Sequence, residues 1–355
     1  MGEQTITNTI DTQEVKTEKT NQRSCWVDTA KAFGIFLVFL GHIWYLSDFP
    51  LLNQMIYSFH VLAFFILSGY VIKRRKEKGG FLKFVWKKFK RLLLPAIVCT
   101  IITLPLYFLS LKTFSTIKIL KRIFFWEGLV AYNDPLWFLI VMFETVVIER
   151  LLKIKDKNVY IKALYFFVFI VAGFLVYRFD IFLPFGLNKM LICLAFLVLG
   201  ILLRELIDVL KNNIKTMNIF LIIAFVVSVG LWFLFGVVLN PKASIYYMTI
   251  GNYWHFCLSG LFGSAWYFII CYGISKLTKF FERVSKPTIL ILGTHYIFTR
   301  GFRRMATSYN FAYTWVYSVT AFIYTILIIA LYVLTVMVIK KITNKYKIKK
   351  EKETV

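Results

Sequence analysis

WVDTAKAFGIFLVFLGHIWYL, residues 26–46, is apolar over most of its length and long enough to cross the roughly 30 Å hydrocarbon core of a bilayer as one helix. Similar stretches recur along the whole chain. Hydrophobic residues make up 59% of the 355 residues, and the mean hydropathy is +0.69, which is unlike soluble globular domains. The composition therefore predicts an integral membrane protein.

About ten segments have the length and apolar composition of a membrane-spanning helix, for which about 20 residues are needed. They are residues 27–47, 51–72, 92–111, 134–152, 161–178, 187–206, 217–239, 253–275, 287–305 and 314–341. The predicted fold class is an all-α polytopic membrane protein of about ten transmembrane helices. Residues 1–24 are expected to form a disordered tail, residues 25–342 the transmembrane domain, and residues 343–355 a basic tail.

The charge distribution predicts the orientation. The chain has 43 Lys and Arg residues against 18 Asp and Glu, a net charge of +25. Most of the basic residues lie in the two terminal segments and in the loops around 73–91, 150–162, 204–216 and 276–286. Because cytoplasmic loops hold the excess of Lys and Arg, both termini are predicted to be cytoplasmic. Arg300, Arg303 and Arg304 are an exception, since this topology places them outside.

The same distribution bears on the partners of the protein. The basic residues are spread over short loops beside the membrane and are not gathered in one soluble domain, so binding to nucleic acid is not indicated. Anionic lipid head groups account for much of the charge. The five cysteines show no CxxC spacing, and no metal site is predicted.

Ionisable groups inside a membrane cost about 2.5–3.5 kcal/mol each, so they are functional candidates by default. Three of the four histidines, His42, His60 and His295, are predicted to be intramembrane, whereas His255 stands at the outer end of its predicted helix. Lys31 precedes His42 by about 16 Å of helix and lies on nearly the same face, so a cation near the cytoplasm and a deeper imidazole share one side. Each histidine also has a simpler interpretation, as a packed polar residue without a chemical role.

A basic segment, FLKFVWKKFKRLLLP at residues 81–95, follows the second predicted helix. Its cations recur over several turns, which is typical of an amphipathic helix at the cytoplasmic surface. Lys88 and Arg91 therefore suit either the phosphates of a cofactor or the head groups of lipids. Just before this segment, Ser68 and Gly69 permit two helix backbones to approach closely, which is a sufficient explanation for small residues there.

Four motifs in the N-terminal part of the chain occur together in one known family. They are Asp28, Lys31 and His42; Phe65-x-x-Ser68-Gly69-Tyr70; Lys88-x-x-Arg91-Leu-Leu-Leu-Pro95; and Pro135-Leu136-Trp137-Phe138-Leu139. This combination resembles the acyltransferase-3 family of integral membrane O-acyltransferases. Phe59-His60 and Trp137-Phe138-Leu139 resemble the branch related to fucose 4-O-acetylases, as does Gly293-Thr294-His295-Tyr296 near the end of the chain.

Three positions depart from the family pattern. Lys31 and Lys88 stand where Arg is common, which keeps the charge but loses the bidentate geometry toward phosphate. Glu144 stands alone where many members have a pair of glutamates.

The resemblance implies a ten-helix enzyme that moves an acyl group, usually acetyl from cytoplasmic acetyl-CoA, to a hydroxyl of a surface polysaccharide or its precursor. Acetyl-CoA is then the donor, and no metal takes part. The expected donor-binding residues are Lys31, Lys88, Arg91, Ser68 and Tyr70.

For the chemistry, acyl transfer needs a base that takes the hydroxyl proton. His42 is the expected base, with His60 or His295 orienting it or polarising the thioester carbonyl. Asp28 completes the expected catalytic set. On the outer side, the expected acceptor contacts are Trp137, Asn252 and Arg300, although an interfacial aromatic belt explains such residues equally well.

Two other classes of function remain open from the residues. In a transporter or flippase of lipid-linked glycans or small solutes, intramembrane His and Lys would line a path for protons. In a receptor or scaffold they would have no chemical role. The expected location is the plasma membrane, bacterial in type, with several membrane passes, and copies of the chain can associate with one another.

Overall fold

A computed structural model describes residues 25–44, 50–72, 79–110, 133–210, 214–240, 243–275 and 279–353. Within these ranges the chain is helical and forms no strand, apart from one isolated bridge between Ser244 and Thr249. The all-α fold class is confirmed. The helices are an N-terminal helix Cys25–Ile43, α2 Pro50–Tyr57, α3 His60–Val71, α4 Phe81–Lys88, α5 Leu94–Ser110, α7 Trp137–Leu152, α8 Val159–Arg178, α9 Leu187–Leu210, α10 Ile214–Phe233, α11 Tyr253–Ile274, α12 Lys279–Ser285, α13 Thr288–Ser308 and α14 Trp315–Glu353.

Among the described residues, eight helical segments are long and apolar enough to cross a membrane, and each overlaps a predicted segment. The largest difference is at Phe81–Leu106, which begins eleven residues before the predicted 92–111 and includes most of the stretch expected at the cytoplasmic surface. The other two predicted segments, 134–152 and 287–305, contain α7 and α13. Helix α7 has only 16 residues, and α13 carries three arginines in its second half, which is why neither meets that requirement. The multi-pass architecture is thus confirmed, whereas the number ten and the side of the termini stay predictions.

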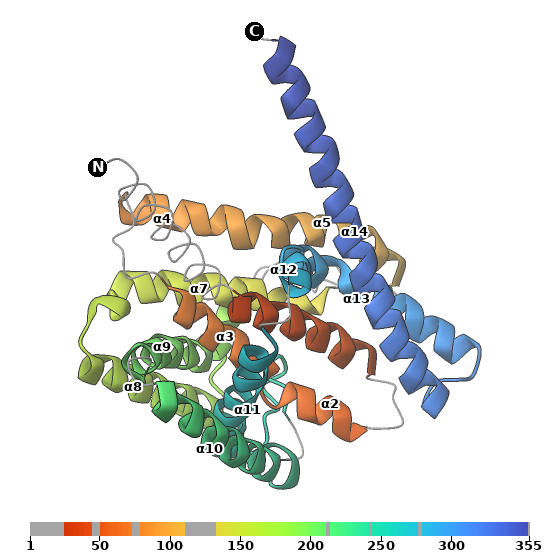
Figure 1. Ribbon diagram of the computed structural model, residues 1–355. Coiled ribbons are helices and arrows are strands. Elements are labelled where there is room, and N and C mark those ends of the chain that lie inside the picture. The colour runs from red at the N-terminus through yellow and green to blue at the C-terminus, as the bar shows by residue number, and fades with distance from the viewer. Residues whose placement is uncertain are drawn as a thin grey trace.

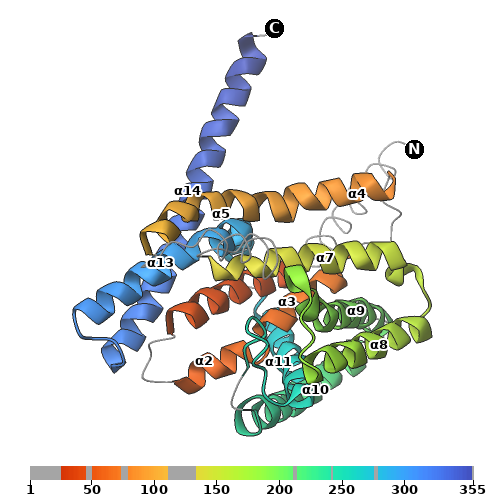
Figure 2. The ribbon, with the colours of Figure 1, turned by 180° about the vertical axis from the view of Figure 1, so that it is seen from behind.

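The N-terminal helix lies inside the bundle and has the largest buried share of the eight candidate spans (Figure 1). It contacts α11 where the hydroxyl of Tyr267 donates to the carbonyl oxygen of Ala30. It contacts α14 through Phe36 and Phe322, whose ring centroids are 5.7 Å apart. The helix that carries Lys31 and His42 is therefore held by protein on several sides. Helix α14, in contrast, extends past the rest of the bundle in both views (Figure 2).

The second predicted segment is not one helix. It breaks at Ser58 and Phe59, so that α2 ends and α3 begins with His60. Backbone groups freed inside a membrane need partners within the protein. The carbonyl oxygen of Ser58 accepts from the hydroxyl of Ser259 at 3.0 Å, and its own hydroxyl oxygen accepts from the indole N–H of Trp232 at 2.9 Å. These contacts stabilise a bend directly beside a candidate catalytic residue.

Helices α3 and α9 cross at two glycines. A Cβ atom added to Gly69 would overlap the carbonyl oxygen of Leu197, and one added to Gly200 would overlap the carbonyl oxygen of Ile66. Contact of backbone with backbone is the geometry that small residues allow between membrane helices. The close approach of two helix backbones, predicted at Ser68 and Gly69, is thus confirmed at Gly69. The crossing fixes α3 against the rest of the bundle.

The surface of the bundle is apolar where lipid is expected. Helices α8, α10 and α14 expose large hydrophobic side chains, including Leu164, Ile222 and Leu327, each more than 60% accessible. Residues 343–353, predicted as part of a tail, continue α14 without a break. Residues 1–24, and the loop at 112–132, lie outside the described residues.

We expect Gly69→Ala and Gly200→Ala each to destabilise the protein by about 3 kcal/mol or more, because overlap with backbone cannot be relieved by a rotamer change. The melting temperature of the detergent-solubilised protein measures this. Gly230→Ala is the matched control, since a Cβ atom there has nothing within 4 Å. Equal melting temperatures for all three variants would contradict the crossing.

Candidate active site

Three histidines from three separate helices meet near the middle of the bundle. The rings of His42 and His295 have centroids 5.2 Å apart. Tyr57 joins the third histidine to this pair: its hydroxyl is 3.2 Å from Nδ1 of His42, and its ring centroid is 5.1 Å from that of His60. The sequence predicted each histidine as a candidate, and the fold gathers them around Tyr57.

The hydrogen bonds of two of these histidines fix their tautomers. Nδ1 of His60 donates to the carbonyl oxygen of Ile56 at 2.7 Å. Nδ1 of His295 is 2.9 Å from the carbonyl oxygen of Ile291 and donates to it. In a neutral ring the other nitrogen, Nε2, is then an acceptor. Nε2 of His295 is buried and has no hydrogen-bond partner among the described residues.

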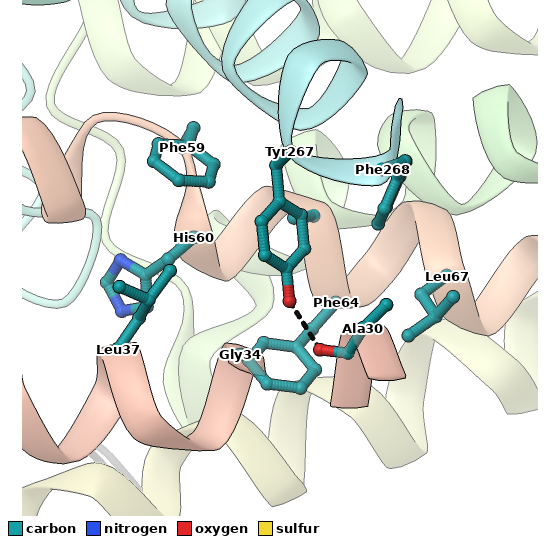
Figure 3. Close-up of a pocket in the computed structure, with 10 residues that line it drawn as sticks. Ala30, Gly34, Leu37, Phe59, His60, Phe64, Leu67, Tyr267 and Phe268 are labelled. Carbon is teal, nitrogen blue, oxygen red and sulfur yellow. Dashed lines mark hydrogen bonds between the residues drawn. The ribbon is translucent and has the colours of Figure 1, made fainter. Parts of the chain in front are cut away.

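A tightly packed crevice closes one side of His60. Its walls include Phe59, Phe64 and Tyr267, and it leaves no room for a water molecule. Figure 3 shows the His60 ring beside Leu37 of the N-terminal helix, with the Tyr267 hydroxyl directed at the carbonyl of Ala30. The histidine cluster is therefore sealed toward α11, and ligands must reach it from another direction.

That direction is a cavity of about 700 Å³, which both His42 and His60 line. Pro135, two residues before α7, and Arg150, near the end of that helix, both line it, so the cavity follows α7 for about 20 Å at the rise of an α-helix. Its middle is apolar, with Val38, Phe138 and Met142 among the walls. The cavity is thus a deep channel between His42 and His60 and the far end of α7.

The far end of the cavity is strongly basic. Seven lining residues are Lys or Arg, against the single acid Glu149, and they are Lys31, Lys87, Lys88, Arg91, Arg150, Lys155 and Lys286. A π-helical turn, Phe89–Leu93, joins α4 to α5 here and carries Arg91. The ammonium group of Lys88 lies 5.2 Å from the ring centroid of Phe84, which orients it along the wall. Such a mouth attracts an anionic ligand.

The predicted donor-binding residues divide into two groups. Lys31, Lys88, Arg91 and Ser68 all line the cavity. Tyr70 does not, because its ring is buried against Trp26 at a centroid distance of 4.7 Å. Its place in the family motif is therefore explained by packing at the start of the N-terminal helix.

The catalytic role expected for Asp28 does not fit its position. Its carboxylate pairs with the ammonium group of Lys31 at 3.4 Å. It also precedes His42 by about 21 Å along the helix, so it does not reach the histidines. Asp28 instead pairs with a cation at the basic end of the cavity.

The three predicted acceptor residues lie in different places. Trp137 lines the cavity and is buried. Arg300 lies over the ring of Tyr296, with 4.6 Å between its guanidinium carbon and the ring centroid, and Tyr296 in turn lies 5.6 Å from His42. Asn252 is remote from the cavity lining. Its side chain accepts from the backbone N–H groups of Trp254 and His255 and caps α11, which accounts for it structurally.

Sequence reasoning assigned no role to four residues beside the site. Tyr57 and Tyr296 carry no signal of their own, because aromatic residues make up 19% of the chain. Lys189 and Glu144 could have been found, since both are ionisable groups inside predicted helices. Lys189 is 4% exposed and lies over Trp137 and Tyr246, while Glu144 interacts electrostatically with it.

Comparison of the sequence with known protein families gives one match. Residues 25–337 match the acyltransferase domain of the acyltransferase-3 family. The chain belongs to this family. It is therefore a membrane acyltransferase, and the histidine cluster at the end of a basic cavity is its candidate active site. Neither the curated proteins nor the solved structures include a match to the chain. Within the described ranges no group of three His, Cys, Asp or Glu side chains is placed to hold a metal ion.

Replacing Tyr57 with Phe is expected to lower kcat for acyl transfer about tenfold while leaving KM for the acyl donor unchanged. The ring still packs on His60, but the hydroxyl that orients His42 is lost. Rates in isolated membranes, normalised to the amount of protein, measure this. Tyr272→Phe, at an exposed position of α11, is the control. An unchanged kcat in the Tyr57 variant would remove the hydroxyl from the site.

Proposed function

We propose that this acyltransferase moves an acetyl group from cytoplasmic acetyl-CoA to a hydroxyl of a cell-surface polysaccharide or its precursor. The observation that carries the proposal is the single cavity that joins seven basic residues at one end to His42 and His60 at the other. A donor with an anionic head and a long, thin, uncharged arm fits this shape. The proposed location is the bacterial plasma membrane, and the branch related to fucose 4-O-acetylases is the proposed subfamily.

The basic end suits the phosphates of CoA. Guanidinium and ammonium groups form strong charge-assisted hydrogen bonds with phosphate oxygens, and Arg91 supplies the bidentate geometry that Lys31 and Lys88 lack. The apolar middle of the cavity suits the pantetheine arm. The distance of about 16 Å between Lys31 and His42 along the helix is then the length that the arm has to bridge.

A short acyl group is favoured by the closed crevice behind His60. A long acyl chain would need a tunnel that continues past the reacting carbonyl. The side of the site toward Phe59 and Tyr267 leaves no room even for water. Acetyl is the acyl group that this packing suits best.

His42 is the proposed general base. When Nδ1 of His42 donates to the Tyr57 oxygen, Nε2 is free to take the proton of the acceptor hydroxyl. The hydroxyl oxygen then bonds to the thioester carbonyl carbon. The carbon–sulfur bond breaks as the tetrahedral intermediate collapses, and CoA leaves as a thiol after receiving the proton from His42.

The tautomer of His60 and the burial of His295 indicate different roles for these two histidines. Nε2 of neutral His60 accepts hydrogen bonds and does not donate them, because its proton is on Nδ1. His60 therefore orients the acceptor hydroxyl and does not polarise the thioester carbonyl. His295, fully buried and in contact with the His42 ring, has the role of holding that ring in place.

Replacing His42 with Ala is expected to abolish acetyl transfer, a loss of at least about 100-fold, with normal amounts of protein in the membrane. Transfer of label from radiolabelled acetyl-CoA to envelope glycan is the measurement. His255→Ala is the control, because His255 is the one histidine outside the cluster and is half-buried beside the carbonyl oxygen of Leu239. Full activity of the His42 variant would exclude it as the base.

Replacing Arg91 with Ala is expected to raise KM for acetyl-CoA about tenfold with little change in kcat, since a phosphate contact is lost far from the reacting atoms. The dependence of the initial rate on acetyl-CoA concentration tests this. Lys90→Ala is the matched control, because Lys90 neighbours Arg91, lies over Trp86 and does not line the cavity. Equal KM values for both variants would count against the donor site.

The function as a whole is tested by deleting the gene and comparing base-labile O-acetyl signals of the surface glycan by NMR. Loss of these signals supports the proposal. A transporter or flippase would lower the amount of glycan at the surface without changing its acetylation, and purified protein would transfer no label from acetyl-CoA.

A further inference from the structure

Three residues of α3 line two spaces at once. They are His60, Phe64 and Leu67, which face both the cavity of about 700 Å³ and the closed crevice behind His60. At spacings of four and three residues they form one stripe along the helix. The crevice is bounded on its other sides by the N-terminal helix and α11, through residues such as Gly34 and Tyr267. The stripe is therefore the wall between the cavity and the crevice.

Phe64 is the middle residue of this wall. Its side chain is half-buried, and its ring centroid lies 5.6 Å from that of Phe138, which lines the cavity. On the other side the ring fills the space in front of Gly34. A Cβ atom added to Gly34 would lie 2.6 Å from Cζ of Phe64, and its three nearest heavy atoms all belong to this ring. Figure 3 shows the Phe64 ring beside Gly34, at the place where the two spaces would otherwise join.

The crevice begins beside the reacting groups. His60 lines it, and the thioester of the proposed donor has to lie near His42 and His60 for acyl transfer. From His60 the crevice follows α3 as far as Leu67, about 10 Å along the helix. Apart from His60 and Tyr267 its walls are apolar, but the side chains fill it so closely that no water molecule has room. A short acyl chain could occupy this space only if part of the wall were removed.

From this arrangement we infer that Phe64 sets the length of the acyl group that the enzyme transfers. The ring closes the way from the cavity into the crevice, so acetyl fits beside His60, whereas the additional methylenes of propionyl and butyryl meet the ring. A pocket discriminates by about tenfold or more for each methylene that it excludes. The inference rests on the proposed function and adds to it the residue that determines which acyl-CoA is used.

Replacing Phe64 with Ala tests the inference. Purified protein in phosphatidylcholine vesicles receives acetyl-CoA, propionyl-CoA or butyryl-CoA, each labelled in the acyl group, with surface glycan of a deletion strain as acceptor. Phe64→Ala is expected to raise the ratio of kcat/KM for butyryl-CoA to kcat/KM for acetyl-CoA at least about tenfold above that of the wild type. Phe64→Leu should raise it less, and this smaller change decides if the Ala variant is inactive. The ratio does not depend on the amount of active protein.

A second substitution should reverse the change. Because Gly34 faces the space that the ring leaves, replacing Gly34 with Leu in the Phe64→Ala variant puts an apolar side chain back into the wall. We expect this double variant to return to within about threefold of the wild-type ratio. Phe167→Ala is the matched control, since it removes an equally large ring from the exposed surface of α8 and should keep the wild-type ratio.

The outcomes separate the inference from the proposed function. A wild-type ratio in both Phe64 variants, with acetyl transfer by the wild type, would overturn the inference and leave the proposed function in place. Equal use of butyryl-CoA and acetyl-CoA by the wild type would overturn the inference together with the preference for acetyl. A raised ratio that Leu at position 34 does not lower would indicate a generally loosened site and would overturn the ring as the barrier. No transfer from any of the three donors would overturn the proposed function and the inference with it.

Discussion

The hydrocarbon core of the membrane offers no solvent for polar groups, and the rest of this structure depends on that constraint. Backbone N–H and C=O groups must be paired within the protein, which leaves helices as the elements that cross. A break in a helix is possible only where other residues supply the missing partners. At Ser58, beside His60, Ser259 of α11 supplies the partner of the backbone carbonyl oxygen, and Trp232 of α10 donates to the Ser58 hydroxyl.

A second break shows the same rule. Helix α10 ends in a π-helical turn, Leu234–Val238, whose carbonyl groups are not all paired within the helix. The side-chain amide of Gln54 in α2 donates to the carbonyl oxygens of Gly236 at 2.9 Å and Asn240 at 2.8 Å. The contacts at both breaks therefore hold α2 against α10 and α11, and this fixes the positions of Tyr57 and His60 relative to the N-terminal helix.

The constraint also shapes the chemistry. Charged groups are costly in the middle of the bundle, so the cavity is basic at its mouth, apolar along its length and lined by imidazoles at its end. An imidazole is a base that can be neutral in such a place. The one buried lysine near the site, Lys189, is placed over two aromatic rings and near Glu144, which lowers the cost of its charge.

The sequence by itself determined the helical fold class, the positions of eight membrane-crossing segments, and the candidates His42, His60, His295, Lys88 and Arg91, because apolar length, charge and intramembrane ionisable residues are properties of local sequence. Only the tertiary structure decided that Tyr57 links two histidines, that Asp28 pairs with Lys31 far from them, and that Tyr70 and Asn252 serve packing and capping. It also decided that Arg300 and Arg303 of α13 lie over Tyr296, whose ring packs against His42. These facts depend on how helices far apart in the chain cross, as at Gly69 and Gly200, and side chains that meet across such crossings leave no periodic pattern in any one segment.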